Sequence, residues 1–348
     1  MRSILHCAVA FSLLSQSESC FRKKKKKVEV LIVGGLKTVA GEVQGTTSDI
    51  LYFDVLSPTK VLPWHGGQLA VGRAKHVAGS SDGKLVVSGG YNMEGGSRVE
   101  LKYTEIVRGG GSDEGPSQAS KLQVGQAAIV AGRKMYVCGG TSASDSEGDG
   151  NKLSKRCEAF SFSDNKWESV RRPVPNRVVD SAMVYDGNNY LYLVGNTRQP
   201  GTAALVAEGP LHRYDLDDDA WVEREQVPTE IRHKPTAAYA SDQGKDALIA
   251  CGSETAGGAQ SCWHYYPEAN VWSKASTPQQ LGMGLKAVRL VSCDGKAYAV
   301  PAATADRAVY VEEFSTESGT WSMTSVQMPP SEFVDDFSLV CNVYYVKA

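Results

Sequence analysis

The sequence lacks an excess of charge of either sign. Lys and Arg number 37 and Asp and Glu number 39, which leaves a net charge of −2 at pH 7. This balance gives no indication of a surface built to bind nucleic acid. After the N-terminal stretch, no apolar run is long enough to cross a bilayer. With 42% hydrophobic residues, the chain has enough apolar material to bury a substantial core.

Motifs that carry catalysis or bind metals are also missing. The sequence contains no G-x-S-x-G, no H-E-x-x-H and no P-loop. No Cys or His pair has the C-x2-C type of spacing that indicates zinc. The acidic segments 145–149 and 217–219 are better explained as solvated turns than as calcium sites. The histidines are scattered: His6, His65, His76, His212, His233 and His264. We therefore expect no metal, no cofactor and no catalytic residue.

What the sequence does contain is a repeat. An apolar run ends in a glycine pair, or in a degenerate version of one, roughly every 50 to 57 residues, and a period of this size indicates a solenoid or a propeller. The six runs are Leu31–Gly35, Leu85–Gly90, Met135–Gly140, Leu191–Asn196, Leu248–Ser253 and Ala297–Ala302. Glycine at these ends permits positive φ or a close approach of another backbone.

A second signal follows four of these runs: an aromatic residue with a tryptophan seven positions later. The pairs are Phe160 and Trp167, Tyr214 and Trp221, Tyr265 and Trp272, and Phe314 and Trp321. Turn residues precede the tryptophan, and a further apolar run precedes each glycine-bearing run, so each unit predicts four antiparallel strands. One such sheet cannot bury both faces alone, and we expect the units to pack radially around an axis.

This pattern of strand, Gly-Gly, aromatic residue and Trp resembles the kelch repeat, from Val28 to the end of the chain. The resemblance implies an all-β kelch-type β-propeller over 28–348, with six four-stranded blades and seven as the less favoured number. The C-terminal run DDFSLVCNVYYVKA would close the N-terminal blade that begins with VEVLIVGG. Two units depart from the pattern, because Trp64 follows Phe53 by eleven residues and Tyr103 has no tryptophan after it.

The N-terminus predicts a secretory signal peptide over residues 1–19, with one basic residue, an apolar stretch and small residues near the end. The alternative is that CAVAFSLL forms the missing first strand of the N-terminal blade. Residues 20–27 are expected to form a solvated basic tail. Its cations could also capture an anionic surface such as a heparin-like glycan, a phosphate-rich surface or anionic lipid. They are Arg22, Lys23, Lys24, Lys25, Lys26 and Lys27.

Cysteines repeat with the units. Cys138 and Cys251 precede the glycine position, and Cys157 and Cys262 lie three residues before the aromatic position. In other units the same two positions are both aliphatic: Val33 with Ile50, Val194 with Leu211, and Val300 with Val311; the second unit has Ser88 with Glu100. Residues that change together in this way are expected to face each other on neighbouring strands, at nearly the separation of a disulfide.

We therefore predict disulfides Cys138–Cys157 and Cys251–Cys262, with four buried thiols as the alternative. Persistent disulfides need an oxidising compartment, which agrees with secretion to the extracellular space. A further bond between Cys20 and Cys341 could join the ends of the ring. Cys293 would then remain as a buried thiol or an intermolecular link.

The resemblance also implies a function. Kelch propellers usually bind through the loops after the second and fourth strands, which here include 141–156, 197–210 and 254–260. Polar residues at the starts of the first strands would surround the same mouth: Arg73, His76, Gln126, Arg177, Arg232, His233 and Lys286. We expect a secreted, non-catalytic module whose partner is a protein or a glycan.

Two other kinds of protein share the fold. One is a carbohydrate-active enzyme of the sialic-acid mutarotase or sugar-oxidase type, although the His, Tyr and Cys grouping of the copper-radical oxidases is absent. The other is an intracellular actin-binding or ubiquitin-ligase-adaptor scaffold. Adaptors of that type carry a dimerisation domain before the propeller, whereas 27 residues precede Val28 here.

Overall fold

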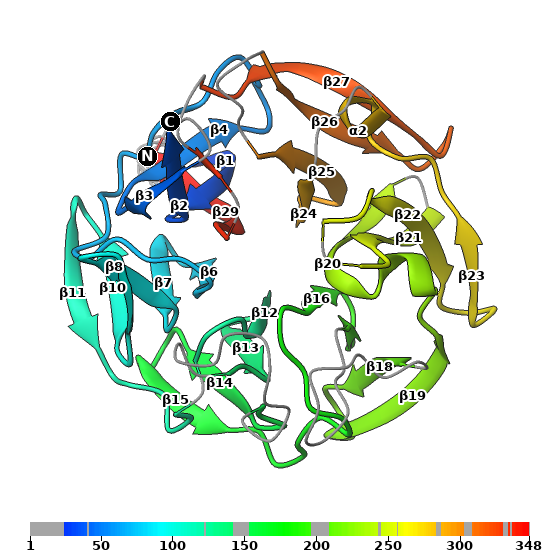
Figure 1. Cartoon of the computed structure of the whole chain (residues 1–348), viewed down its shortest axis with the longest axis horizontal. Helices are drawn as coiled ribbons and strands as arrows, with labels where there is room; N and C mark the ends of the chain where they lie inside the picture. The colour runs from blue at the N-terminus through cyan, green and yellow to red at the C-terminus, as the bar shows by residue number, and fades with distance from the viewer. Residues whose placement is uncertain are drawn as a thin grey trace, which may run out of the picture.

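The chain forms a ring of six antiparallel sheets around a central axis in a computed structural model (Figure 1). The structure describes residues 24–39, 42–121, 123–141, 153–195, 209–242, 245–255, 257–282, 287–302, 308–329, 333–334 and 336–347. Each of the six sheets has four strands, which confirms the expected six-bladed propeller. Within the described residues, no helix is both long and apolar enough to span a membrane.

We number the blades along the chain and give their strands from the axis outward. Blade 1 contains β29 (Ser338–Lys347), β1 (Lys24–Val33), β4 (Ile50–Asp54) and β5 (Leu62–Pro63). Blade 2 contains β6 (Val77–Ser81), β7 (Lys84–Ser88), β10 (Thr104–Arg108) and β11 (Gly111–Gly115). Blade 3 contains β12 (Ala127–Ala131), β13 (Lys134–Cys138), β14 (Cys157–Ser161) and β15 (Lys166–Ser169).

The other three blades follow the simple order of the repeat. Blade 4 contains β16 (Ala182–Tyr185), β17 (Tyr190–Val194), β18 (Pro210–Asp215) and β19 (Ala220–Gln226). Blade 5 contains β20 (His233–Asp242), β21 (Lys245–Ser253), β22 (Ser261–Tyr266) and β23 (Val271–Lys274). Blade 6 contains β24 (Val288–Cys293), β25 (Lys296–Pro301), β26 (Tyr310–Ser315) and β27 (Thr320–Gln327). Short helices η2 (Thr229–Ile231) and α2 (Gln279–Gly282) precede β20 and β24.

The two ends of the chain close the ring, as the sequence predicted. β29 is the innermost strand of blade 1 and pairs with β1 along its whole length, from Lys24 opposite Lys347 to Val33 opposite Ser338. A buried cluster behind this seam joins β1 to blades 5 and 6, through residues such as Phe53 and Tyr298. Ring closure therefore combines backbone pairing with apolar packing.

The aromatic and tryptophan signals lie opposite each other on the third and fourth strands. Phe160 faces Trp167, with ring centroids 5.3 Å apart, and Phe314 faces Trp321 at 5.1 Å. The Trp321 indole also donates a hydrogen bond to the carbonyl of Ser276 in the linker from blade 5. Trp167 and Trp221 likewise donate to carbonyls of the preceding linker, those of Pro116 and Arg172, so three of the four pairs also secure the connection from the blade before.

The glycine pairs are explained by a close backbone contact between neighbouring blades. Gly139 has φ +78°, and a Cβ there would lie 2.5 Å from the carbonyl oxygen of Val178, in the linker to blade 4. Gly89 repeats this geometry in blade 2, where a Cβ would lie 2.4 Å from the carbonyl oxygen of Gln123. Only glycine leaves room for the linker to pass so close to the second strand.

Two sequence expectations were wrong in detail. First, β1 begins at Lys24, so Lys24–Lys27 belong to the propeller and not to a basic tail ending before Val28. Second, Ser88 faces Thr104 and not Glu100. A hairpin of β8 (Tyr91–Glu94) and β9 (Ser97–Glu100) is inserted between β7 and β10, and it takes up the residues that the repeat assigns to the third strand.

The structure contains both predicted disulfides, Cys138–Cys157 and Cys251–Cys262, each between directly opposite residues of the second and third strands. A third bond joins Cys293 to Cys341. The predicted Cys20–Cys341 bond is therefore wrong, because Cys341 pairs with Cys293. Cys20 and the predicted signal peptide lie outside the described residues. Cys293 lies on β24 and Cys341 on β29, so this bond links blade 6 to blade 1 across the seam of the ring.

Candidate functional site

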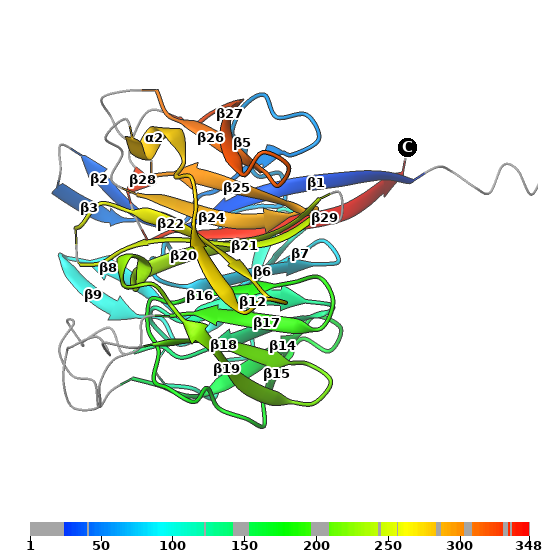
Figure 2. The same cartoon turned by 90° about the vertical axis from the view of Figure 1, so that its right-hand side faces the viewer.

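One end of the propeller carries extra hairpins and is here called the hairpin face. There, β2 (Leu36–Val39) and β3 (Glu42–Thr46) form a small sheet with β28 (Phe333–Val334), and the β8–β9 hairpin stands beside them (Figure 2). Thr46 hydrogen-bonds the side chain of Asn92, and the backbone N–H of Met93 donates to Thr46 Oγ1 at 3.4 Å. The hairpins thus form one wall above blades 1 and 2.

At the centre of the hairpin face, the chain turns inward at a residue with positive φ at or just before the start of five of the innermost strands. We call these five residues the axial collar: Asp336, Lys75, Gly125, Asp180 and Lys234, with φ between 45° and 66°. Backbone hydrogen bonds connect the first four of them in sequence. Lys75 N–H donates to the carbonyl of Asp336 (3.1 Å), Gly125 N–H to that of Lys75 (3.0 Å), and Asp180 N–H to that of Gly125 (2.7 Å). The left-handed backbone is retained because the neighbouring blades secure it.

Four of the five collar residues carry a charged side chain, and Lys75 pairs with Asp180 around the axis. Lys75 Nζ lies 3.0 Å and 3.2 Å from the two carboxylate oxygens of Asp180, two blades away. Gly125 lies between them, and a Cβ at this position would come within 2.6 Å of Asp180 Oδ1. Arg289 on β24 approaches Asp336 at 3.6 Å. The collar therefore presents both signs of charge to a ligand.

Burial alone would lower the pKa of the Lys75 ammonium. The carboxylates of Asp180 and Asp336 oppose this effect, and the pKa of Lys75 is raised above its ordinary value. The lysine is consequently charged at any physiological pH. The Lys75–Asp180 pair is largely but not fully buried, with side-chain exposures of 17% and 18%, so a ligand can still reach it.

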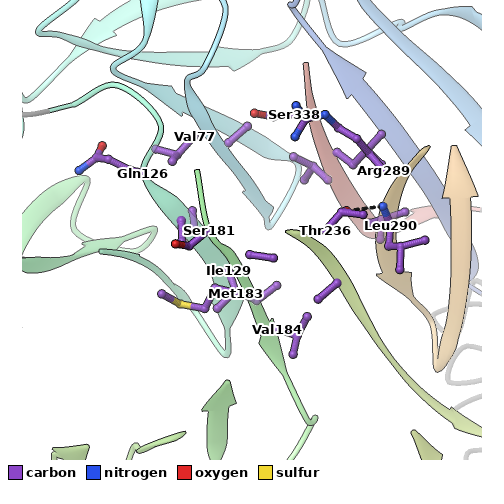
Figure 3. Close-up of a pocket in the computed structure, with 18 of the residues that line it drawn as sticks. Val77, Gln126, Ile129, Ser181, Met183, Val184, Thr236, Arg289, Leu290 and Ser338 are labelled. Carbon is purple, nitrogen blue, oxygen red and sulfur yellow. Dashed lines mark hydrogen bonds between the residues drawn. The ribbon is translucent and has the colours of Figure 1, made fainter. Parts of the chain in front are cut away.

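A pocket of about 370 Å³ lies inside the collar, lined by the innermost strands of all six blades. Figure 3 shows side chains from these strands arranged around it, including Val77, Met183 and Arg289. Much of the wall consists of Ala, Gly and Val. The space suits a small group or a single inserted side chain.

Most hydroxyl groups in the wall already bond to a neighbouring blade. Thr236 Oγ1 accepts from the backbone N–H of Leu290 (2.6 Å, dashed in Figure 3), and Ser292 Oγ accepts from that of Tyr239 (2.6 Å). The hydroxyl of Ser338 donates to the carbonyl of His76 (2.8 Å). These groups hold the ring together, which leaves the charges of the collar as the main polar chemistry available to a ligand.

Of the predicted site residues that the structure describes, only His76 and Gln126 line the pocket. Gln126 lines the pocket and exchanges side-chain hydrogen bonds with Gln118. Arg177 donates to the carbonyl of Leu153, between β13 and β14 of blade 3, and Arg232 donates to the carbonyl of Val227 in its own linker. Neither arginine lines the pocket, nor does His233. Lys286 and most of the loops 141–156 and 197–210 lie outside the described residues.

Arg73 corrects the sequence expectation most clearly. Its side chain is completely buried, forms an ion pair with Glu105 and donates to the carbonyl of Gly89 at 3.1 Å. Its guanidinium also lies 5.0 Å from the ring centre of Tyr103. Arg73 is thus a buried structural link within blade 2, with no exposed surface.

His76 borders the pocket, but its imidazole is buried and neither ring nitrogen has a hydrogen-bond partner. Burial, together with the nearby Arg73 and Arg289 cations, lowers the pKa of His76 to about 3. It is a neutral packing residue beneath Gly34. Among the described residues, no group of three or more His, Cys, Asp or Glu side chains could hold a metal ion.

Two buried glutamates that could suggest catalysis secure linkers instead. Glu158 accepts hydrogen bonds from the backbone N–H groups of Ala119 (3.1 Å) and Ser120 (3.0 Å) in the linker that leads into its own blade. Glu312 binds Gln279 and Gln280 in the same way in blade 6. In both blades, the third strand uses a carboxylate to secure the incoming linker.

The charged collar residues were missed from the sequence, although the predicted Arg73, His76 and His233 lie within two positions of them. In each of these units, one residue of the innermost strand lies opposite the cysteine position of the second strand, as Val77 lies opposite Ser88. The collar residue is two positions before that residue, as Lys75 is before Val77, so an alignment of the units on this residue would have found it. Their pairing could not have been found this way, since Lys75 and Asp180 are 105 residues apart.

Comparison with known proteins agrees with this geometry. The family model for the Kelch motif matches residues 124–173, the region of blade 3 that contains its four strands. No curated protein sequence matches the chain.

Proposed function

Since the chain is a kelch-repeat β-propeller, we propose that it is a secreted, non-catalytic binding module that holds a protein ligand on its hairpin face. The observation that carries this proposal is the axial collar beside the hairpin wall. The collar offers two lysines and two aspartates around a pocket large enough for an inserted side chain. A protein loop or chain terminus with charges of both signs would complement it.

The hairpin wall supports a protein in preference to a glycan. Val43 on β3 and Val99 on β9 have exposed fractions of 51% and 40%, although both lie on paired strands. Beneath them, Tyr91, Ala74 and Val124 form a buried cluster that anchors the wall. Protein interfaces combine apolar contacts of this kind with a polar surround, whereas the pocket wall has few unpaired hydroxyl groups to bind sugar.

The location in the secretory pathway rests on the disulfides. The bonds lie within blades 3 and 5 and at the seam, and five of their six cysteines are buried while Cys341 is partly buried. Disulfides of this kind persist in oxidising compartments. Expression of the full chain in a secreting cell should release it into the medium with residues 1–19 removed. A retained N-terminus with reduced cysteines would contradict this part of the proposal.

The binding proposal can be tested with a displayed library of constrained peptide loops and a glycan array. We expect the wild-type protein to select peptides, and Val43→Asp or Val99→Asp to weaken their binding at least tenfold. Val271→Asp is the matched control, because Val271 is similarly exposed (46%) on an outer strand of blade 5. Equal loss in the control, or binding of glycans alone, would refute a protein-binding hairpin face.

A further inference from the structure

A second charged surface lies at the other end of the propeller. β1 and β29 continue past the rest of blade 1, and Figure 2 shows them projecting together on the side away from the hairpin face. β4 pairs with β1 only from Glu29 to Val33. Over Lys24–Lys27, β29 is therefore the only strand beside β1 in the described part of the chain. We call Lys24–Lys27 with Tyr344–Lys347 the basic ribbon.

The ribbon concentrates positive charge in a protein whose net charge is −2. It contains five lysines and no acidic residue, with Lys24 opposite Lys347 at its tip. Two of its lysines meet carboxylates near the propeller body: Lys26 with Asp294 (2.5 Å) and Lys27 with Asp54 (3.1 Å). Lys25 is exposed and has no such partner in the described residues. Among the three β1 lysines with described side chains, Lys25 is therefore the least compensated, and it is the one nearest the tip.

The ribbon also carries an exposed aromatic residue. Tyr345 has an exposed fraction of 64%, and it lies directly opposite Lys26. On the other face, Tyr344 is fixed by a hydrogen bond from its hydroxyl to Glu29 (2.6 Å) and a contact with His65 Nε2 (3.3 Å). The base of the ribbon is therefore held in place, and its lysines need little further ordering to bind a ligand.

We infer that the basic ribbon binds a linear sulfated polysaccharide. Successive residues of a strand point to opposite faces, so Lys26 lies on one face and Lys25 and Lys27 on the other. A flat membrane could meet only one of these faces at a time. A linear polyanion running along the unpaired edge of β1 can contact cations on both faces, and the backbone N–H groups of an open edge add further donors.

The inference depends on the proposed secretion, because sulfated polysaccharides are extracellular ligands. It is separate from the hairpin face, which lies at the opposite end of the axis (Figure 2). A protein anchored to a polysaccharide through the ribbon would keep its hairpin face open to a protein partner.

The test measures binding of purified protein to a heparin decasaccharide at several salt concentrations. Replacing Lys24→Gln and Lys25→Gln together should weaken binding at least tenfold and reduce the dependence of log K on log salt by roughly one for each lysine removed. The matched control is Lys60→Gln with Lys102→Gln, two exposed lysines outside the ribbon that give the same change in net charge. The control should retain binding within twofold.

Three outcomes would overturn the inference. Equal losses in both double variants would mean that binding follows net charge and not the ribbon. Binding to vesicles of phosphatidylserine and phosphatidylcholine without binding to heparin would indicate a membrane. Aggregation of the Lys24→Gln/Lys25→Gln variant, with no heparin binding by the wild type, would show that the lysines only protect an open strand edge. None of these outcomes bears on the peptide-binding test of the hairpin face.

Discussion

Stability between neutral and mildly acidic pH should depend on His76. Its pKa is about 3 in the folded protein because the ring is buried and two arginines lie nearby. The unfolded chain has the ordinary value of about 6.5. As the pH falls below about 6.5, His76 takes up a proton in the unfolded state and not in the folded state, which favours unfolding. The contribution of His76 to the free energy of unfolding is therefore complete above that pH and is progressively lost toward pH 3.

The size of the effect follows from the two pKa values. Between pH 7 and pH 5 the unfolded state gains most of one proton that the folded state does not bind, which lowers the free energy of unfolding by about 2 kcal/mol. His212 on β18 is also buried, and burial lowers its pKa to about 4. It should contribute roughly another 2 kcal/mol.

The measurement is equilibrium urea unfolding at pH 5, 6 and 7 under non-reducing conditions. His76→Gln is the natural variant, since Gln126 stands at the equivalent repeat position in blade 3. We expect the variant to lose about 2 kcal/mol less than the wild type between pH 7 and pH 5, whatever its stability at pH 7. His212→Gln should have a similar effect. An unchanged pH dependence in His76→Gln would show that His76 is not held neutral by the fold.

Three further predictions concern the ring. Replacing Cys293 and Cys341 by Ser should lower the free energy of unfolding by about 4 kcal/mol, because the bond joins residues 48 positions apart in the sequence. Denaturant titration measures this loss, and a loss below about 1 kcal/mol would contradict the role of the bond at the seam. Gly139→Val should strongly lower the thermal unfolding temperature, because the added Cβ would clash with a backbone carbonyl. Gly132→Val is the control: a Cβ there has open space around it, so only the positive φ should lower the stability. Glu158→Gln should cost roughly 1.5 to 3 kcal/mol in unfolding free energy by weakening two charge-assisted hydrogen bonds, and wild-type stability in this variant would refute the linker role.

Much of the fold could be predicted because its signals are local. The glycine position, the aromatic residue and the tryptophan recur within each unit and face each other within one sheet, as Phe160 and Trp167 do. The same logic located the disulfides of blades 3 and 5, since Cys138 and Cys157 lie on adjacent strands. It failed in blade 2, where an inserted hairpin changed the partner of Ser88.

The repeat alone therefore determined the architecture, the number of blades and two of the disulfides of this protein. Only the tertiary structure decided which residues meet at the axis, because closing the ring brings together positions more than a hundred residues apart, such as Lys75 and Asp180. Ring closure also paired Cys293 with Cys341 and turned four lysines of an apparent tail into a strand. Contacts between blades arise from the rotation of one sheet against the next, and no single repeat encodes them.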